Sequence, residues 1–417
     1  MRIERDRYLN QLKSARHNGL VKVVTGLRRS GKSYLLFTLF HDFLIEDGVE
    51  EDHIIEIALD DLDNEALRKP DVLLSRIRSS LKDNKTHYVI LDEIQLVPGF
   101  VEVLNSLLHN RNVDVYVTGS NSHLLSSDIA TEFRGRGFVI QLYPLSFAEF
   151  LTAYEGTQDE AWEDYYTYGG LPLVLNIDGD KGKSDYLSDL YETVYLLDVK
   201  ERHGIRNLSE FKELMQVLAS SIGSPVNPLK LSNTFKSEKH SKIASATISR
   251  YLDYLTDAFI AEKALRYDIK GKKYIGTLSK YYFSDLGIRN AILGFRQQEE
   301  SHIMENIIYN ELISRGYRVD VGHVLIRTTD KNGRPIRKSL EVDFVVNEGS
   351  QRYYIQSALD MPNLEKVEQE KKVLTEIPDS FKKIIVVKDR IKLKRDEKGI
   401  VTMSIFDFLL SHSAINL

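Results

Sequence analysis

The fold of this chain is decided by one stretch near its start, VKVVTGLRRSGKSYLL, which runs from Val21 to Leu36. Its apolar, β-branched beginning predicts a strand, and the apolar spacing after Lys32 predicts a helix. Between them stands the pattern G-x-x-x-x-G-K-S, from Gly26 to Ser33. Glycines let the backbone wrap a phosphate with its N–H groups pointing inward, and the helix N-terminus adds positive potential. The stretch therefore predicts a phosphate-binding loop.

The residue types in this loop assign roles to individual side chains. Lys32 would reach the β- and γ-phosphates of a nucleotide, and the Ser33 hydroxyl would bind Mg²⁺. The alternative is a flexible turn with an exposed lysine, which the strand before the loop and the helix after it disfavour. We expect nucleotide contacts from Gly26, Arg28, Arg29, Ser30, Gly31, Lys32, Ser33 and Tyr34.

Length and composition limit the other possibilities. A chain of 417 residues exceeds one ordinary core, so two or three domains are expected. The net charge of −5 gives no global signal for nucleic acid, so any such contact needs a local basic patch. The absence of cysteine excludes disulfides, thiolate zinc sites and cysteine nucleophiles. The charged start and the lack of long apolar runs predict a soluble cytoplasmic protein without membrane contact.

Strand and helix patterns alternate through the first third of the chain. Helices are expected at 4–18, 33–47, 72–81 and 101–108, and further strands at 53–59, 86–94, 114–122 and 137–145. This order predicts an α/β fold with a parallel, doubly wound sheet of the P-loop type. In such sheets, ligands lie outside the carboxyl ends of the strands.

The pattern changes beyond Pro144, and four domains are expected. Residues 1–150 would bind the nucleotide, and the almost wholly helical residues 151–225 predict a helical lid. From 226 to 298, a helix, a Ser/Lys-rich turn, a second helix and two extended stretches follow in the order of a winged helix-turn-helix. Residues 299–417 predict a C-terminal α+β domain.

Two acids end the strand expected at 86–94. A carboxylate at Asp92 would hold Mg²⁺ through water, and Glu93 would orient the water that attacks a γ-phosphate. Buried strands often end in acids, but the phosphate loop about 60 residues earlier supports the functional interpretation. At the end of the next strand, Ser120 and Asn121 either contact the γ-phosphate or form an ordinary polar turn.

The segment FRGRG places Arg134 and Arg136 just before the last expected strand of this sheet. An arginine that stabilises charge on a transferring phosphoryl group approaches from outside the loop's own pocket, often from a neighbouring subunit. A solvated charged turn is the alternative. Flanking glycines free the backbone to present Arg136. We therefore favour Arg136 as the catalytic arginine and expect a homo-oligomer.

A set of segments carries a resemblance to a known family: GLRRSGKS, YVILDE, VTGSNS, FRGRG, PLSFAEF and YGGLP. Together they resemble the bacterial and archaeal AAA-type ATPases that carry a C-terminal domain of uncertain function. The resemblance implies ATP and Mg²⁺ as cofactors, with Lys32 and Ser33 in the phosphate loop. It also implies Asp92 and Glu93 as the Mg²⁺ and catalytic acids, Asn121 as a sensor and Arg136 as a finger. The family implies ATP rather than GTP, and no guanine-reading Asn-Lys-x-Asp appears in the sequence.

Basic side chains gather between residues 228 and 250. They are Lys230, Lys236, Lys239, Lys242 and Arg250, against the single acid Glu238. On the helix expected at 245–255, Thr247, Ser249 and Arg250 would face a DNA groove while Ile248, Leu252 and Leu255 pack inward. A protein-contact surface is the alternative. The sequence leaves both interpretations open.

The order of helix and strands in residues 299–417 resembles the restriction-endonuclease-like fold. In that pattern a helix acid, a strand Asp and a Gln or acid hold a metal, and Glu305, Asp343 and Gln356 match these places. Alternation in SLEVDFVV predicts Leu340, Val342, Phe344 and Val346 on one strand face, with Glu341 and Asp343 on the other. Ala358 stands where the pattern requires a lysine, so we expect this domain to bind a partner or nucleic acid rather than cut it. Alternatively, the two acids only solvate an outer strand face.

Together these patterns predict an enzyme that binds and hydrolyses ATP with Mg²⁺ and thereby switches the arrangement of its domains. One rival is a nucleotide-responsive DNA- or protein-binding regulator with slow turnover, and another is an ATP-driven nuclease. Glu93 favours hydrolysis over the regulator, because that function needs no group to orient water.

Overall fold

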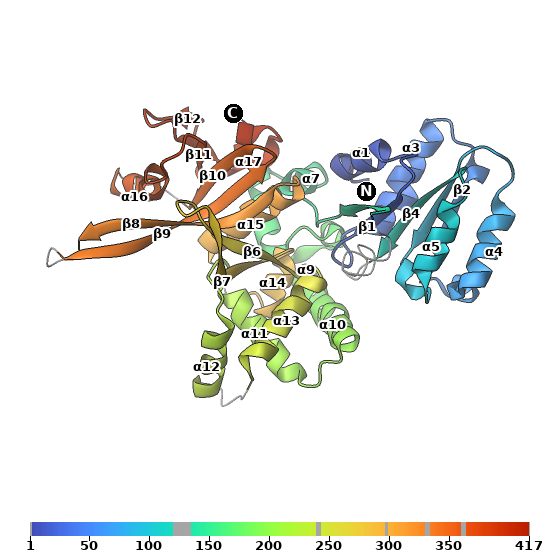
Figure 1. Ribbon diagram of the computed structural model, residues 1–417, viewed down its shortest axis with the longest axis horizontal. Helices are drawn as coiled ribbons and strands as arrows, with labels where there is room; N and C mark the ends of the chain where they lie inside the picture. Colours follow the sequence, from blue (N-terminus) through green and yellow to red (C-terminus); the bar gives the residue numbers. More distant parts are fainter. Residues whose placement is uncertain are drawn as a thin grey trace. The chain divides into compact units, whose positions relative to one another are not determined.

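The computed structural model describes residues 2–119, 135–238, 243–296, 299–329, 334–359 and 364–416. The chain forms two compact units. The first contains Met1–Leu145 with the short segments Leu171–Leu173 and Asp257–Phe259. The second contains Ser146–Gly170, Val174–Thr256 and Ile260–Leu417. Figure 1 shows the elements of the first unit mostly in blue and cyan.

The first unit alternates strands and helices along the chain. Its elements are α1 (Asp6–Ser14), β1 (Val21–Thr25), α2 (Lys32–Tyr34), the π-helical η1 (Leu35–Phe40), α3 (His41–Glu46), η2 (Glu51–His53), β2 (Ile54–Ala58), η3 (Leu62–Arg68), α4 (Pro70–Ser80), β3 (His87–Asp92), η4 (Ile94–Leu96), α5 (Phe100–Leu108), β4 (Val113–Gly119) and β5 (Gly137–Gln141). The helix after β1 is continuous in sequence from α2 through η1 to α3. A π-helical segment of this kind often lies near a functional site.

The five strands form one parallel sheet in the order β2-β3-β4-β1-β5. All five residues of β1 and all six of β3 are buried, as expected for strands covered on both faces. One core cluster joins Val23, Val89 and Val117 to α4 and α5. The other joins Val24, Ile90 and Tyr116 to α1 and to the helix after the loop. This three-layer arrangement confirms the predicted α/β fold.

The second unit begins with helices. They are α7 (Phe147–Thr152), α8 (Gln158–Tyr168), η6 (Pro172–Asn176), α9 (Gly179–Leu190), the π-helical η7 (Tyr191–Tyr195), α10 (Leu196–His203), α11 (Leu208–Ser220), α12 (Pro228–Glu238) and α13 (Ser245–Asp257). Two capping boxes, at Ser146 and Thr157, fix the starts of α7 and α8. Tyr165, Phe147 and Phe150 pack edge to face beneath them.

Strands dominate the rest of the second unit. Its elements are β6 (Ala261–Asp268), β7 (Lys273–Phe283), α14 (Leu286–Ile292), α15 (Glu300–Ser314), β8 (Arg318–Thr329), β9 (Pro335–Glu348), β10 (Gln351–Ala358), α16 (Leu364–Thr375), β11 (Lys382–Val387), β12 (Lys394–Arg395), β13 (Val401–Ser404), α17 (Ile405–Leu410) and η8 (Ala414–Asn416). Eight strands form one sheet in the order β12-β13-β11-β10-β9-β8-β6-β7.

This sheet joins two segments that the sequence placed in different domains. The α12, α13, β6 and β7 elements follow in the predicted order, and β6 and β7 pair as an antiparallel hairpin. The same β6 also pairs in parallel with β8 of the C-terminal segment. The hairpin therefore belongs to the same sheet as the C-terminal strands. The division at 298 stays a proposal.

No helix within the described ranges is both long enough and apolar enough to cross a membrane.

Candidate active site

The loop after β1 has a backbone that glycine alone allows at one point. Gly26 has φ +140°, and a Cβ atom there would lie 2.1 Å from the backbone oxygen of Leu142. Further along, Arg29 and Gly31 have φ of 65° and 97°. Left-handed residues between right-handed ones turn successive N–H groups toward one side, which forms a concave anion site. This geometry agrees with the predicted phosphate loop.

Lys32 opens α2 and lies folded over the loop. Its Nζ donates hydrogen bonds to the backbone oxygens of Gly26 and Leu27, each at 3.1 Å. Lys32 is buried, with 5% of its surface exposed. The ammonium group therefore lies inside the ring of backbone that a phosphate would enter.

Ser33 and Asp92 meet, although they lie far apart in the sequence. Ser33 Oγ donates a 2.7 Å hydrogen bond to Asp92 Oδ2, which joins the loop to the carboxyl end of β3. Burial raises the pKa of Asp92, while hydrogen bonds from Thr118 and Ser33 oppose this shift. A divalent cation beside the carboxylate would favour its ionised form in the same way.

Thr118, at the end of β4, was not predicted as a site residue. Its hydroxyl donates to the other oxygen of Asp92 and accepts a 3.0 Å hydrogen bond from the Glu93 backbone N–H. Thr118 is fully buried. The threonine thus connects the two predicted acids. Its position next to Gly119 at a strand end was the available sequence signal.

Glu93 has a backbone conformation that is uncommon for a residue with a side chain. Its φ is 52°, in the left-handed region. Gln95 Nε2 donates to one of its carboxylate oxygens. Uncommon backbone conformations of this kind cost of order 1 kcal/mol or more and cluster at functional sites. The turn directs the chain away from β3 directly after the two acids.

Arg5 also contacts the loop and has no recognisable signal in the sequence. It is 2% exposed, and its guanidinium donates to the backbone oxygens of Ser30 at 3.3 Å and Tyr143 at 2.7 Å. Because Tyr143 follows β5, Arg5 ties the phosphate loop to the segment after that strand. At the end of α2, the Tyr34 hydroxyl accepts a 3.3 Å hydrogen bond from the Ile3 backbone N–H.

Arg136 lies at the other edge of the same sheet. Its backbone oxygen accepts a 3.0 Å hydrogen bond from the N–H of Val21, the first residue of β1. The loop begins after Thr25, at the far end of β1, about 16 Å away at 3.3 Å per residue. The exposed Arg136 side chain contacts Asn105 Oδ1 at 3.3 Å. The structure therefore does not bring Arg136 to the loop of its own chain.

Some predicted residues fall outside the described ranges. These are Ser120, Asn121 and Arg134 near the nucleotide site, and Lys239 and Lys242 in the basic patch. The remaining members of that patch, Lys230, Lys236 and Arg250, are exposed. Ile248, Leu252 and Leu255 are buried on the inner side of α13, as predicted.

A second group of charged side chains joins α15 to the C-terminal sheet. Lys280 Nζ, from β7, lies 2.9 Å from Glu305 Oε1 and 2.7 Å from Glu341 Oε1. Burial alone would lower the pKa of Lys280, but Glu305, Asp343 and Glu341 together raise it above its ordinary value. Burial, and next the charge of Glu305, raise the pKa of Asp343. The three acids thus share one site with a lysine that sequence spacing did not identify.

The predicted alternation along β9 is wrong at one point. The pairing of β8 with β9 shifts register between Asp320 and Gly322, which marks a β-bulge. Val342 and Val345 consequently belong to the same apolar cluster, whereas Phe344 packs near Tyr282 and Tyr309. Asp343 accepts a 2.8 Å hydrogen bond from the Ser357 N–H, and Gln356 Oε1 lies 3.4 Å from the Asp343 N.

Comparison with known proteins identifies the first unit. Residues 18–151 match the family described as an AAA domain, and residues 159–299 match a domain of unknown function, DUF8612. The second match spans the segments that we expected to form the lid and the winged helix.

Two relatives and one solved structure extend these matches. An uncharacterized protein of Haemophilus influenzae is 33% identical over 98% of this chain and 98% of its own length. An uncharacterized protein of Methanocaldococcus jannaschii is 31% identical over 78% of this chain and 72% of its own. The structure of a Walker-type ATPase of Pyrococcus abyssi superposes with a TM-score of 0.51 at 15% identity, over 70% of this chain and 96% of that one. The chain therefore belongs to the same family as the Haemophilus and Methanocaldococcus proteins and carries the AAA domain of a P-loop ATPase.

Proposed function

We propose that the chain binds ATP with Mg²⁺ at the loop of residues 26–33 and hydrolyses it. One observation carries this proposal: the 2.7 Å hydrogen bond between Ser33 Oγ and Asp92 Oδ2. It joins the loop hydroxyl to the strand-end carboxylate, which are the two groups expected to hold Mg²⁺. A cation held there would neutralise charge that develops on the phosphates.

Several features of the loop support a phosphate ligand. The Lys32 ammonium donates hydrogen bonds to the backbone carbonyls of Gly26 and Leu27, and a phosphate would be a stronger acceptor. The Ser30 hydroxyl is among the buried groups that lack a hydrogen-bond partner in the described part of the chain. Buried polar groups without a partner are rare, which favours a ligand that satisfies them.

The acids and the arginine complete the proposed site. Glu93 would orient the attacking water, and its backbone is held at Thr118. Asn121 would serve as the sensor, and Arg136 as a finger supplied to a neighbouring subunit of a homo-oligomer. Arg28, Arg29, Ser30 and Tyr34 would contact the nucleotide beside Gly26, Gly31, Lys32 and Ser33.

Lys32→Ala protein is expected to bind Mg·ATP about 10- to 150-fold more weakly, because charge-assisted hydrogen bonds to phosphate are lost. Isothermal titration with ATP, with and without Mg²⁺, measures the change. Lys69→Ala, at an exposed lysine before α4, is the matched control and should bind as the wild type does. Equal ATP affinity in Lys32→Ala and wild-type protein would remove the loop from the proposal.

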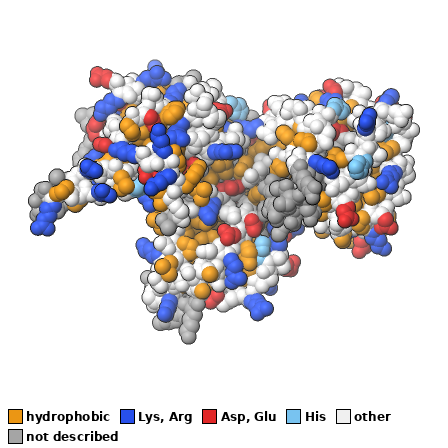
Figure 2. Space-filling model, viewed as in Figure 1, with side chains coloured by type: hydrophobic (Ala, Val, Ile, Leu, Met, Phe, Trp, Pro, Cys, Tyr) orange, Lys and Arg blue, Asp and Glu red, His pale blue; other side chains and the backbone are white. Residues whose placement is uncertain are grey.

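We further propose that hydrolysis changes the arrangement of the nucleotide domain, lid, winged-helix and C-terminal domains of a cytoplasmic protein. DNA is one candidate target, through Lys230, Lys236 and Arg250. A second basic surface follows the β8–β9 hairpin, where Arg327, Arg337 and Lys338 are exposed. Figure 2 shows blue side chains along this hairpin, which projects to the left of the view. Such surfaces support phosphate contacts that weaken with salt.

The rival function is a regulator in which nucleotide occupancy is the signal and turnover is slow. Such a regulator would have a low turnover number, and replacing Glu93 would not change it. The same ATP assay, repeated with duplex DNA at two salt concentrations, separates DNA-dependent hydrolysis from simple occupancy.

For the C-terminal domain we propose binding without cleavage. Lys280 forms ion pairs with Glu305 and Glu341, so a fixed ammonium occupies part of the place where cleavage would need a divalent cation. Ala358 is 4% exposed and belongs to an apolar cluster with Tyr354 and Leu374. A charged lysine side chain does not suit this apolar cluster, so position 358 does not supply a catalytic lysine.

Supercoiled and single-stranded DNA are expected to stay intact when incubated with the purified protein and Mg²⁺ or Mn²⁺. Agarose gels at several protein concentrations provide the measurement. Asp343→Asn protein, purified in parallel, identifies a contaminating nuclease, because contamination would be independent of that residue. Cleavage by the wild type that disappears in Asp343→Asn would overturn this proposal and favour the ATP-driven nuclease.

A further inference from the structure

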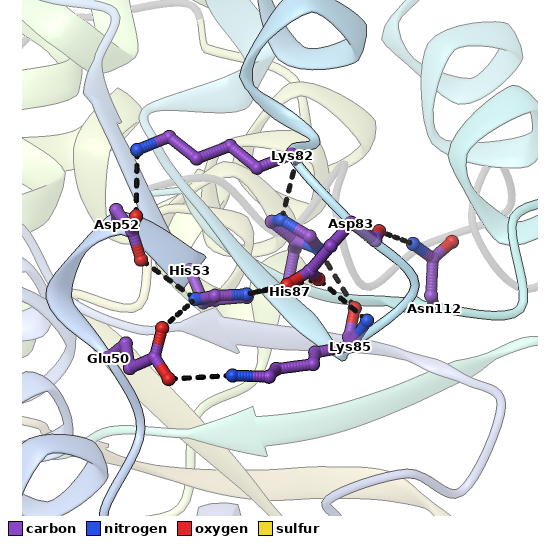
Figure 3. A network of polar contacts seen from close by, with 8 residues as sticks. All are labelled: Glu50, Asp52, His53, Lys82, Asp83, Lys85, His87 and Asn112. Atoms are coloured by element: carbon purple, nitrogen blue, oxygen red, sulfur yellow. Dashed lines mark hydrogen bonds and ion pairs between the residues drawn. The ribbon is translucent and has the colours of Figure 1, made fainter.

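Two histidines meet at the edge of the first sheet that lies opposite the nucleotide site. His53 ends η2 just before β2, and His87 begins β3. Because Ile54 and Tyr88 are paired in the parallel register, the two imidazoles lie side by side, with ring centroids 4.6 Å apart. His53 is 4% exposed and His87 is fully buried. Figure 3 shows both rings with the polar groups around them.

The hydrogen bonds of His87 define which ring nitrogen carries the proton. Its Nδ1 lies 2.9 Å from the backbone oxygen of Lys85, and a carbonyl can only accept, so Nδ1 is protonated. Its Nε2 accepts a 3.1 Å hydrogen bond from the Lys82 backbone N–H. Each ring nitrogen thus has one partner, with Nδ1 as the donor and Nε2 as the acceptor, and Figure 3 shows both contacts.

His53 has the corresponding arrangement with a carboxylate in place of the carbonyl. Its Nδ1 lies 2.8 Å from Asp52 Oδ1, and its Nε2 lies 3.1 and 3.2 Å from the two oxygens of Asp83. Histidines that bind metals typically donate one ring N–H to a carbonyl or carboxylate and bind through the other nitrogen. In both rings, Nδ1 already has a carbonyl or carboxylate partner of this kind.

Asp83 supplies an oxygen ligand next to the rings. One ligand atom each from His53, Asp83 and His87 lies within 4.8 Å of the others. Tetrahedral zinc, with bonds of about 2.0 to 2.1 Å, separates its ligands by about 3.3 Å. The distances from His53 Nε2 to the two Asp83 oxygens, 3.1 and 3.2 Å, are close to that separation. The Lys85 backbone N–H donates a 2.7 Å hydrogen bond to Asp83 Oδ1 and so holds the carboxylate in place beside the rings.

The surrounding charges leave Asp83 as the carboxylate that faces both rings. Lys82 Nζ pairs with Asp52 at 2.7 Å, and Lys85 Nζ pairs with Glu50 at 2.6 Å. Asn112 Nδ2 donates to the backbone oxygen of Asp83 at 3.1 Å and holds the turn before β3. The turn is thus anchored through its backbone, while the Asp83 side chain remains accessible, with 42% of its surface exposed.

We propose that His53, His87 and Asp83 bind a borderline divalent transition metal such as Zn²⁺, with water as a further ligand. Two imidazoles and one carboxylate suit zinc, cobalt or nickel better than magnesium or calcium, which prefer oxygen ligands. Binding removes any proton from His53 Nε2 and replaces the Lys82 hydrogen bond at His87 Nε2. The metal links the turn before β2 to the turn before β3, about 16 Å from the carboxyl ends of the strands.

Untagged full-length protein, stripped with EDTA and dialysed, is titrated with ZnCl₂ in a calorimeter and with CoCl₂ in a spectrophotometer. We expect one zinc per chain and a visible ligand-field absorption for bound cobalt. At a free zinc concentration 100 times Kd, the melting temperature should rise by about 5 °C or more.

Asp83→Asn and His53→Gln are expected to lower zinc affinity at least about 10-fold and to remove the cobalt absorption. His109→Gln, at an exposed histidine of the same unit, is the matched control and should bind zinc normally. Circular dichroism shows whether His53→Gln folds, and Asp83→Asn, at an exposed position, keeps the test valid if it does not. No zinc or cobalt binding by the wild type, or binding that both variants retain, would establish a plain ion-pair network instead.

Discussion

Glu93→Gln protein is expected to turn over ATP about 100- to 10,000-fold more slowly than the wild type while still binding it. Glutamine keeps the shape of the side chain but lacks the charge that orients and polarises the attacking water. Because the change acts on the transition state, the affinity for ATP should stay within a few-fold. Phosphate release in a single-turnover assay gives the rate, and gel filtration with labelled ATP shows the trapped nucleotide.

The contacts of Glu93 show what the substitution to glutamine keeps and what it changes. The Glu93 backbone N–H donates to Thr118 Oγ1, and glutamine at this position keeps that hydrogen bond, whereas Gln95 donates to the carboxylate that the substitution replaces. Glu102→Gln, at an exposed glutamate on α5, is the matched control and should keep wild-type turnover. Turnover within two-fold of the wild type in Glu93→Gln would exclude Glu93 as the group that orients water. It would also favour the regulator with slow turnover if the wild-type rate were itself low.

Much of the first unit could be predicted because its signals are local. The phosphate loop needs glycine at positions whose backbone excludes other residues, as the 2.1 Å approach of Leu142 to Gly26 illustrates. The strands are buried on both faces, so they read as continuous apolar runs that end in polar residues. Asp92 and Glu93 follow such a run, and the parallel sheet brings their strand end next to the loop.

The missed residues depend on contacts between distant parts of the chain. Arg5 holds Ser30 and Tyr143 through backbone oxygens, and such a contact leaves no pattern in the sequence. Lys280 reaches the acids Glu305 and Glu341 from a strand that the sequence pattern predicts in another domain. Local periodicity also failed in β9, because a bulge that depends on the partner strand changes which side chains share a face.

An equal mixture of Arg136→Ala and Lys32→Ala proteins is expected to regain about a quarter of wild-type ATPase activity, although each variant alone is nearly inactive. An arginine finger from a neighbouring subunit raises turnover about 1,000-fold or more, so its loss should inactivate every site of the Arg136→Ala protein. In randomly mixed oligomers, one interface in about four combines an intact loop with an intact arginine.

The positions of Arg136 and the loop relative to β1 explain why this experiment tests a role in a neighbouring subunit. Arg136 is hydrogen-bonded to Val21 at the amino edge of the sheet, whereas the loop starts after Thr25 at the carboxyl edge. An arginine at one end of a strand cannot serve the loop at the other end of the neighbouring strand. The same arginine can reach the loop of a second subunit that packs against the amino edge of this sheet. Arg111→Ala, at an exposed arginine just before β4 on the same edge, is the matched control and should keep its activity alone. If sedimentation demonstrates mixed oligomers and no activity returns, Arg136 does not act across a subunit boundary; full activity of Arg136→Ala alone would mean that it has no catalytic role.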